Sequence, residues 1–343
     1  MRRVGLVMLF GALGAAAATG SCGDDTVVLV PPADATVAEA AAAPEAAAPD
    51  ASEAGDASAL DASAEAGDAS PPDADAGEPP VRFAVIGDYG SGSGRELAVA
   101  NMVLAWKPDF IVTTGDNNYG TAVDSYDPNV GQFYHEYIAP YAGAYGAGAA
   151  KNAFFPCIGN HDWDIGGGVP YFDFFELPGN ERYFELVKGP AHFVFLDSDA
   201  REPDGNTSTS VQGQWAEAAI GAASEPFTFV VLHHPAYTSG SRTPVMDWPF
   251  KTWGADAVLT GHVHNYERLV STDGLVYFVN GQGGRDTHAF GAVHPASKLR
   301  YNTLDGAQLV TVTRAKATFR YYAVDGSLID EYAVDPTGAS VPP

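Results

Sequence analysis

Five short polar blocks occur along this chain, each directly after an apolar run. They carry Asp, Asn, His and Tyr side chains, which are common ligands of metal ions. A lone Gly-Asp or His-x-His pair is frequent by chance, but five such blocks that all follow predicted strands indicate one two-metal hydrolase site. In chain order the blocks are Gly87-Asp88-Tyr89-Gly90, Gly115-Asp116-Asn117-Asn118-Tyr119, Gly159-Asn160-His161-Asp162, Val230-Val231-Leu232-His233 and Gly261-His262-Val263-His264.

Seven side chains of these blocks can be divided between two ions. Asp116 suits the bridging position, because its carboxylate stands at a strand end between the two halves of the site. The predicted ligands are Asp88, Tyr119 and His264 for the first ion, and Asn160, His233 and His262 for the second. Hard anionic oxygens, including a Tyr phenolate, favour Fe(III) in the first position, and mostly neutral ligands favour divalent Fe, Zn or Mn in the second. With a bound hydroxide, the formal charge of such a centre is about +1, which can hold a phosphate monoester.

The elements that must position these side chains are those of an α/β domain that begins near Val81. Strands over 82–86 and 110–114, joined by a helix over about 95–106, should lie parallel, so that Asp88 and Asp116 meet at the edge where open α/β sheets bind ligands. Two sheets packed face to face with helices outside would account for the whole order. The remaining predicted strands cover 154–158, 183–187, 192–197, 227–232, 257–260, 275–280, 307–313, 317–323 and 328–334, and helices are predicted near 130–138 and over 212–223.

The first 80 residues have a different composition. Residues 1–21 are typical of a bacterial export signal, because Arg2 and Arg3 precede an apolar stretch too short to span a membrane. Thr19-Gly20-Ser21-Cys22 resembles a lipobox, which predicts lipid on Cys22; plain cleavage near Ala18 and a retained anchor are the alternatives. We therefore predict an exported protein held at the periplasmic, outer-membrane or cell surface as a lipoprotein, rather than a fully secreted one. Residues 22–80 predict a disordered tether, since they offer too little apolar surface to offset the entropy of ordering.

The charge of the chain limits its partners. The net charge is -25, and residues 22–80 contribute 14 acidic side chains and no basic ones, which leaves -13 for the domain from residue 81 onward. An acidic domain argues against nucleic acid as a partner, because phosphate backbones require basic surface. Small phosphate esters would have to be attracted by the metal ions themselves. Cys157 is the only cysteine besides Cys22 and is predicted to be a buried, unreactive thiol.

The five blocks resemble those of the purple acid phosphatases, in particular the small tartrate-resistant type, within the calcineurin-like metallophosphoesterases. The resemblance covers about residues 82–334, and its most diagnostic element is Tyr119, three residues after Asp116, since related phosphoesterases usually lack a Tyr there. It implies an α/β/β/α sandwich for residues 81–343 and an acid phosphatase that hydrolyses phosphate monoesters with a metal-bound hydroxide. It also implies that His161 and Asp116 are catalytic and that Asn160 and His161 bind substrate. The metal ligands that it implies are Asp88, Asp116, Tyr119, Asn160, His233, His262 and His264.

One position departs from the family pattern and leaves the leaving-group acid open. The family commonly has a second outer-sphere histidine nine or ten residues beyond the position of His233, where this chain has Arg242 and Thr243. His161, His288 or His294 could take that role, or Arg242 could bind phosphate directly. Arg285 is a weaker candidate for a substrate contact.

Two other functional classes fit parts of the sequence. A phosphodiesterase or nucleotide hydrolase with two divalent ions would accommodate a Tyr119 that packs away from metal. A surface binding protein with a vestigial site is a second alternative. The sequence does not indicate the oligomeric state.

Overall fold

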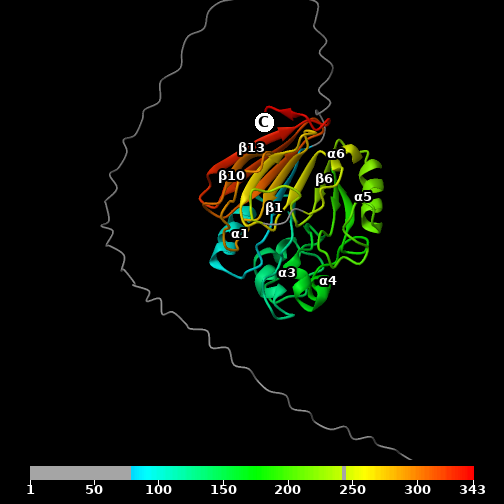
Figure 1. Cartoon of the computed structure of the whole chain (residues 1–343). Coiled ribbons are helices and arrows are strands. Elements are labelled where there is room, and N and C mark those ends of the chain that lie inside the picture. Colours follow the sequence, from blue (N-terminus) through cyan, green and yellow to red (C-terminus); the bar gives the residue numbers. More distant parts are fainter. Residues whose placement is uncertain (1–78, 242–244) are drawn as a thin grey trace, which may run out of the picture. The chain divides into compact units, whose positions relative to one another are not determined.

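The computed structural model describes residues 79–241 and 245–343 (Figure 1). The predicted export signal, Cys22 with its predicted lipid, and the predicted tether up to residue 78 lie outside the described residues, as do Arg242 and Thr243. Among the described residues, no helix is both long and apolar enough to cross a membrane.

The first sheet has seven strands and brings three of the predicted ligand blocks together. Strands β1 (Val81–Ile86), β2 (Phe110–Thr113) and β3 (Phe154–Pro156) are parallel, and α1 (Gly94–Trp106) is the crossover between β1 and β2. The N-cap of α1 is Ser93, whose side chain accepts a hydrogen bond from Glu96 N. The strand order is β14 (Ser340–Val341), β13 (Leu328–Val334), β12 (Ala317–Ala323), β11 (Gly306–Val312), β1 (Val81–Ile86), β2 (Phe110–Thr113) and β3 (Phe154–Pro156).

The second sheet also has seven strands and carries the histidine blocks. Strands β5 (Ala191–Phe195), β6 (Phe227–Val231), β7 (Ala257–Thr260) and β9 (Val276–Asn280) are parallel. Three antiparallel strands complete the sheet: β4 (Phe184–Lys188) pairs with β5, β8 (Tyr266–Val270) with β9, and β10 (Ser297–Tyr301) with β8. Helix α5 (Val211–Gly221) leads into β6, and α6 (Phe250–Trp253) leads into β7. The strand order is β10 (Ser297–Tyr301), β8 (Tyr266–Val270), β9 (Val276–Asn280), β7 (Ala257–Thr260), β6 (Phe227–Val231), β5 (Ala191–Phe195) and β4 (Phe184–Lys188).

An aromatic core joins the two sheets. Phe83 on β1 contacts Phe193 on β5 edge to face, with ring centroids 5.1 Å apart, and Phe229 on β6 contacts Phe319 on β12 at 5.7 Å. Successive residues of β6 alternate between this core and the outer face, where Val230 belongs to the buried cluster that α5 and α6 help to form. Figure 1 shows these two helices beside the strands of the second sheet. The predicted fold of two packed mixed sheets with flanking helices is confirmed.

Several elements were not predicted. The short helices are η1 (Asp127–Gly131), α2 (Gln132–Tyr134), η2 (His135–Tyr137), α3 (Asn160–Asp164), η3 (Gly166–Gly168), α4 (Val169–Phe174) and α6, and of these only the region of η1, α2 and η2 was predicted to be helical. Strands β8, β10 and β14 were also missed. Strand β8 contains Glu267 and Arg268, whose charges are satisfied by Ser239 and Asp330 from distant segments. Strand β10 is a polar edge strand, so the hydrophobic pattern that predicts central strands is weak there.

Candidate metal centre

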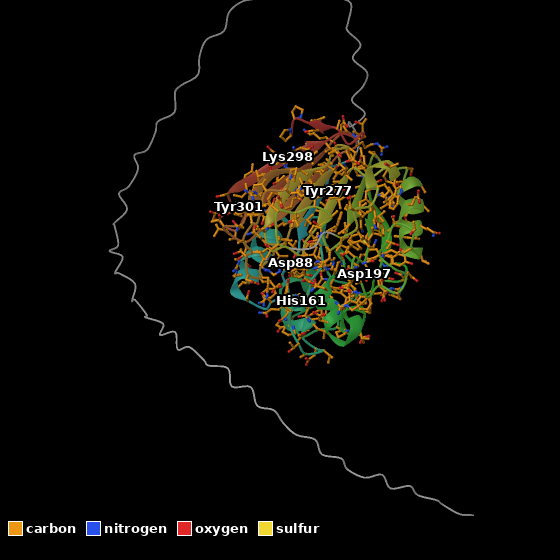
Figure 2. The ribbon with its side chains drawn as sticks, in the orientation of Figure 1. Asp88, His161, Asp197, Tyr277, Lys298 and Tyr301 are labelled. Atoms are coloured by element: carbon orange, nitrogen blue, oxygen red, sulfur yellow. The ribbon has the colours of Figure 1, made fainter. Side chains whose placement is uncertain are left out.

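All seven predicted ligands lie at the carboxyl ends of parallel strands or just beyond them. In the first sheet, Asp88 follows β1, Asp116 follows β2 and Asn160 follows β3. In the second sheet His233 follows β6, and His262 and His264 follow β7. Because the two sheets are packed together, these edges meet at one end of the sandwich, where Figure 2 also places Asp88 and His161.

The first group of ligand atoms surrounds the Tyr119 hydroxyl. This oxygen lies 3.2 Å from Asp88 Oδ1, 3.2 Å from Asp116 Oδ2 and 3.1 Å from His264 Nε2. His264 Nε2 also lies 3.3 Å from Asp88 Oδ1. Three oxygens and one imidazole nitrogen therefore converge on one small volume.

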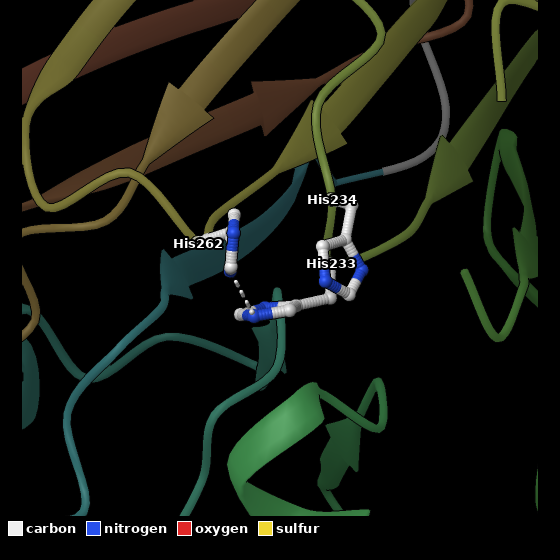
Figure 3. A group of neighbouring side chains, drawn as sticks. All are labelled: His233, His234 and His262. Carbon is white, nitrogen blue, oxygen red and sulfur yellow. Dashed lines mark hydrogen bonds between the residues drawn. The ribbon is translucent and has the colours of Figure 1, made fainter. Parts of the chain in front are cut away.

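The second group surrounds Nε2 of the fully buried His233. That nitrogen lies 3.1 Å from Asn160 Oδ1, 3.2 Å from Asp116 Oδ1 and 3.2 Å from His262 Nδ1. Figure 3 shows the contact between His233 and His262 as a dashed line, with His234 beside them. Asp116 thus gives one carboxylate oxygen to each group, as a bridging ligand must.

The spacing within both groups fits a shared cation. Donor atoms about 2.1 Å from one ion stand about 3.0 Å apart in octahedral and about 3.4 Å apart in tetrahedral coordination. The distances of 3.1 to 3.3 Å in the first group and 3.1 to 3.2 Å in the second fall inside this interval. The donor atoms are carboxylate, amide and phenol oxygens and imidazole nitrogens, which suit Fe, Zn and Mn. The chain's own residues therefore fit a pair of transition-metal ions.

Two of the imidazoles are fixed by backbone carbonyl groups. His233 Nδ1 lies 2.8 Å from the carbonyl oxygen of Thr114, and His264 Nδ1 lies 2.9 Å from that of Asp286. In each ring the Nδ1–H donates to the carbonyl, so that Nε2 keeps its lone pair for an ion. Such supporting hydrogen bonds orient a ligand and raise its basicity.

The glycines of the blocks allow the ligands to approach one another. A side chain at three of them would collide with a ligand of another block, so the Gly-Asp, Gly-Asn and Gly-His pairs are a steric requirement of the site. The closest approaches of a Cβ would be 2.6 Å from Gly115 to His233 Nδ1, 2.3 Å from Gly159 to Asp116 N, and 2.6 Å from Gly261 to Asp88 Oδ2.

The backbone of the site is also strained. Six of the described residues other than glycine have positive φ, and three of these are predicted ligands: Asp88 at 56°, Asp116 at 51° and His262 at 67°. Left-handed conformations of such residues cost on the order of 1 to 3 kcal/mol each, and strain of this kind concentrates at functional sites. The observed outliers thus point to function at the same residues as the ligand geometry does.

The electrostatics of the first group require a cation if Tyr119 is to ionise. Burial raises the pKa of Tyr119 well above its ordinary value, and the neighbouring Asp88 and Asp116 raise it further. Burial alone would also raise the pKa of Asp116, but the adjacent His233 outweighs burial and lowers it. A phenolate at Tyr119 is therefore stable only with a positive ion inside the group.

Comparison with known proteins agrees with this geometry. The profile of the calcineurin-like phosphoesterase family matches residues 81–266, a span that contains all seven predicted ligands. The chain belongs to this family. Among its curated relatives, tartrate-resistant acid phosphatase type 5 of Homo sapiens is 24% identical over 298 residues, which cover 74% of this chain and 90% of the human protein.

Solved structures of this phosphoesterase fold are similar at low identity. Purple acid phosphatase PPD1 from yellow lupin (Lupinus luteus) matches with a TM-score of 0.59 at 17% identity, covering 75% of this chain and 54% of the lupin chain. GAP50, described as the anchor in the inner membrane complex of Plasmodium, matches with a TM-score of 0.59 at 16% identity, covering 75% of this chain and 89% of the GAP50 chain. At these identities the structural likeness shows the fold alone.

His161 of this phosphoesterase lies beside the two ligand groups, at the hollow next to them. Its ring is 4.5 Å from that of Tyr119, its Nε2 is 4.0 Å from Asp116 Oδ2, and its side chain is 45% exposed. It lines a hollow of about 270 Å³. The lining residues are Asp116, Tyr119, Asn160, His161, His262, His264, Arg285, Asp286 and His288.

The other histidines divide into those at the site and those away from it. His288 lines the hollow, and its ring stacks on His264 at 3.9 Å. His234 contacts the second group, with its ring 4.3 Å from that of His262 and its Nδ1 2.8 Å from Ser198 Oγ. Burial and the neighbouring His233 lower the pKa of His234 to about 3, which keeps it neutral. His294 does not line the hollow and contacts Ser239 and Tyr237 instead.

Three supporting residues were not assigned a role from the sequence. Asp162 accepts hydrogen bonds from the backbone of Gly159 and Asn117 and from the Tyr126 hydroxyl, which ties the second and third blocks together. Asn117 and Asp162 stand inside the blocks, so their positions could have indicated a supporting role. Arg201 donates to the carbonyl oxygen of Asn160 at 3.0 Å, and nothing in the sequence near Arg201 signals this contact.

Proposed function

We propose that this chain is a dinuclear-metal acid phosphatase that hydrolyses phosphate monoesters. The observation that carries the proposal is the position of the Tyr119 hydroxyl. It lies 3.2 Å from a carboxylate oxygen of Asp88, 3.2 Å from one of Asp116, and 3.1 Å from His264 Nε2. A Tyr that packed away from the ions would have favoured the phosphodiesterase alternative. The similarity to tartrate-resistant acid phosphatase type 5 over most of both chains supports the same assignment.

The proposed ions are Fe(III) in the first group and divalent Fe, Zn or Mn in the second. The first group has three acidic oxygen donors, and Tyr119 ionises there only against a strong positive charge. The second group has the other oxygen of Asp116 and three neutral donors, which a divalent ion satisfies.

The chain's residues have separate tasks in the proposed reaction. When bound, two metal ions supply Lewis acidity and an activated water as the nucleophile. Asp116 fixes the spacing of the two groups, and Asn160 and His161 face the hollow in which the phosphoryl group would lie. The partly exposed side chain of His161 lines the hollow and can give a proton to the leaving-group oxygen. We expect activity to be higher in acid, because protonation of the substrate weakens its repulsion by the acidic surface.

The proposal is tested by metal analysis, a visible spectrum and a pair of substrates. About one iron and one further metal per chain, a broad visible band, and faster hydrolysis of an aryl phosphate monoester than of the matching diester would support it. Two Zn or Mn ions in a colourless protein that prefers the diester would support the phosphodiesterase alternative. A protein that binds no metal and hydrolyses neither substrate would support the binding-protein alternative, and the likeness to GAP50 shows that the fold alone does not decide this.

We also propose that the protein is exported and carries lipid on Cys22, with residues 22–80 as a spacer. This proposal rests on the sequence of residues 1–80. Mass spectrometry of the mature N-terminus tests it: a diacylated Cys22 would support it, and an unmodified N-terminus near Ala18 would contradict it.

A further inference from the structure

The loop after β9 is packed tightly against the first ligand block. Gly283 N donates to the carbonyl oxygen of Gly87 at 2.9 Å, and Arg285 N donates to that of Asp88 at 3.1 Å. A side chain at Gly283 would place its Cβ 2.4 Å from the Gly87 oxygen, and Gly284 has a φ of 132° that L-residues rarely adopt. The backbone of Arg285 is therefore held in a fixed position beside Asp88.

From this position the Arg285 side chain reaches over Tyr119. Its guanidinium carbon lies 4.8 Å from the centroid of the Tyr119 ring, and its Nε lies 3.4 Å from Asp286 Oδ1. The side chain is 46% exposed, and that of Asp286 is 62% exposed. Since the Tyr119 oxygen belongs to the first ligand group and Arg285 also lines the hollow, the guanidinium lies beside that group.

Arg285 is also the permanent cation of the hollow. The described residues that line it include Asp116, Asp286 and four histidines, but Arg285 is the one Arg or Lys among them. In a domain with a net charge of -13, the surface as a whole repels a phosphate ester. The planar guanidinium presents parallel N–H donors that match two oxygens of a phosphoryl group.

We propose that Arg285 binds the phosphoryl group of the substrate, through oxygens that the metal ions leave free. This inference rests on the proposed phosphatase function and adds a phosphate-binding residue to it. Without substrate, the guanidinium rests on the Tyr119 ring and pairs with exposed Asp286. When substrate binds, its doubly charged phosphate takes the place of Asp286 at the guanidinium, because the pair with Asp286 is weak and solvated.

Titration of the metal-loaded full chain with orthophosphate tests the proposal, with binding followed by calorimetry. Loss of a charge-assisted hydrogen bond should raise the Kd for orthophosphate by about 10- to 100-fold in Arg285→Ala, and KM for a monoester in parallel. Arg285→Lys should recover part of the lost affinity, because it restores the positive charge but not the two parallel N–H donors. Metal content, measured on the same samples, should stay at two ions per chain.

Arg300→Ala is the matched control. Arg300 lies over the Phe290 ring at 5.0 Å, is exposed, and does not line the hollow. The same type of cation and aromatic contact is thus removed away from the ions, and the Kd for orthophosphate should not change.

A spectroscopic readout reports on the contact between Arg285 and Tyr119, independently of phosphate binding. A cation over the face of a phenolate stabilises its π electrons, so removing it should move an iron-phenolate band to longer wavelength in Arg285→Ala. An unchanged band with an unchanged orthophosphate Kd would overturn the inference.

Failure of the inference and failure of the proposed function give different results. Equal orthophosphate binding by wild type and Arg285→Ala, with monoesterase activity intact, would overturn the role of Arg285 alone. Tighter binding by wild type without monoesterase activity would overturn the phosphatase assignment and support the phosphate-binding role. A metal-loaded wild type that binds no orthophosphate would overturn both.

Discussion

Gly115 offers a sharp test of how the second ligand group is held. In a Gly115→Ala variant the new Cβ would lie 2.6 Å from Nδ1, 2.8 Å from Cγ and 2.9 Å from Cβ of His233. Ordinary contacts begin near 3.4 Å, so the ring would have to move by about 0.8 Å. His233 is fully buried, and its Nδ1 is held 2.8 Å from the Thr114 carbonyl oxygen. The ring can therefore move only by breaking that hydrogen bond or by leaving the ligand group.

The expected cost has two parts. An Ala at the φ of 91° found for Gly115 is strained by about 1 to 2 kcal/mol. Overpacking against a buried ring adds about 1 to 3 kcal/mol. We therefore expect Gly115→Ala to lower the free energy of unfolding of the metal-free protein by roughly 2 to 5 kcal/mol, and to weaken binding of the second ion by about 10- to 100-fold.

Gly274→Ala is the matched control for the strain. Gly274 has a φ of 87°, and a Cβ there would have no atom within 4 Å. This variant should lower the free energy of unfolding only by the backbone strain, about 1 to 2 kcal/mol, and should keep both ions. The assay is urea unfolding of the metal-free proteins together with the metal content of the loaded proteins. Equal losses of stability in the two variants, with two ions retained in both, would refute the packing argument.

Three further predictions follow from the same structure. Tyr119→Phe should abolish the visible band while far-ultraviolet circular dichroism stays native, and a retained band would rule out Tyr119 as the source of the colour. Chelation of the ions should lower Tm reversibly, because an ion at 100 times its Kd stabilises the folded chain by about 2.7 kcal/mol; an unchanged Tm would mean that neither group binds metal. Burial raises the pKa of Asp256 to about 6, so the folded state holds this proton more tightly than the unfolded state does. Its contribution to stability is thus complete below about pH 4 and is lost as the pH rises to about 6, by roughly 3 kcal/mol at most. Asp256→Asn, which keeps an oxygen acceptor for Thr228 N, should flatten this part of the stability curve measured by urea unfolding, whereas parallel curves would contradict the assigned burial.

The strained ligands predict that the site tolerates few substitutions. Asp88, Asp116 and His262 adopt positive φ, and each is held by glycines or backbone donors of neighbouring blocks. His262 N, for example, donates to Asp88 Oδ2 at 2.8 Å, and His161 N donates to Asp116 Oδ1 at 2.8 Å. Each ligand block therefore supports the geometry of another one, and the cost of the strained backbone is met by contacts across both sheets.

Local sequence determined most of the strands, the order of the blocks and the candidate ligands. An apolar run such as Phe110–Thr113 predicts a strand, because a buried strand contains few polar residues. The polar residues that follow such a run can therefore be recognised as a possible site. The two-sheet fold could be predicted for the same reason. The edge strand β10 and the charged strand β8 could not, since their partners, such as Asp330 for Arg268, are more than 60 residues away in the chain.

Only the tertiary structure decided how these residues act together. The packing of one sheet edge against the other decides which oxygen of Asp116 faces each ligand group and which carbonyl fixes each imidazole. It also brings Arg285 over the ring of Tyr119. Arg201 and Asn160 are brought together in the same way. The physical reason is that a sequence pattern reports burial and local conformation. Metal coordination and phosphate binding instead require distances of a few ångströms between residues up to two hundred positions apart.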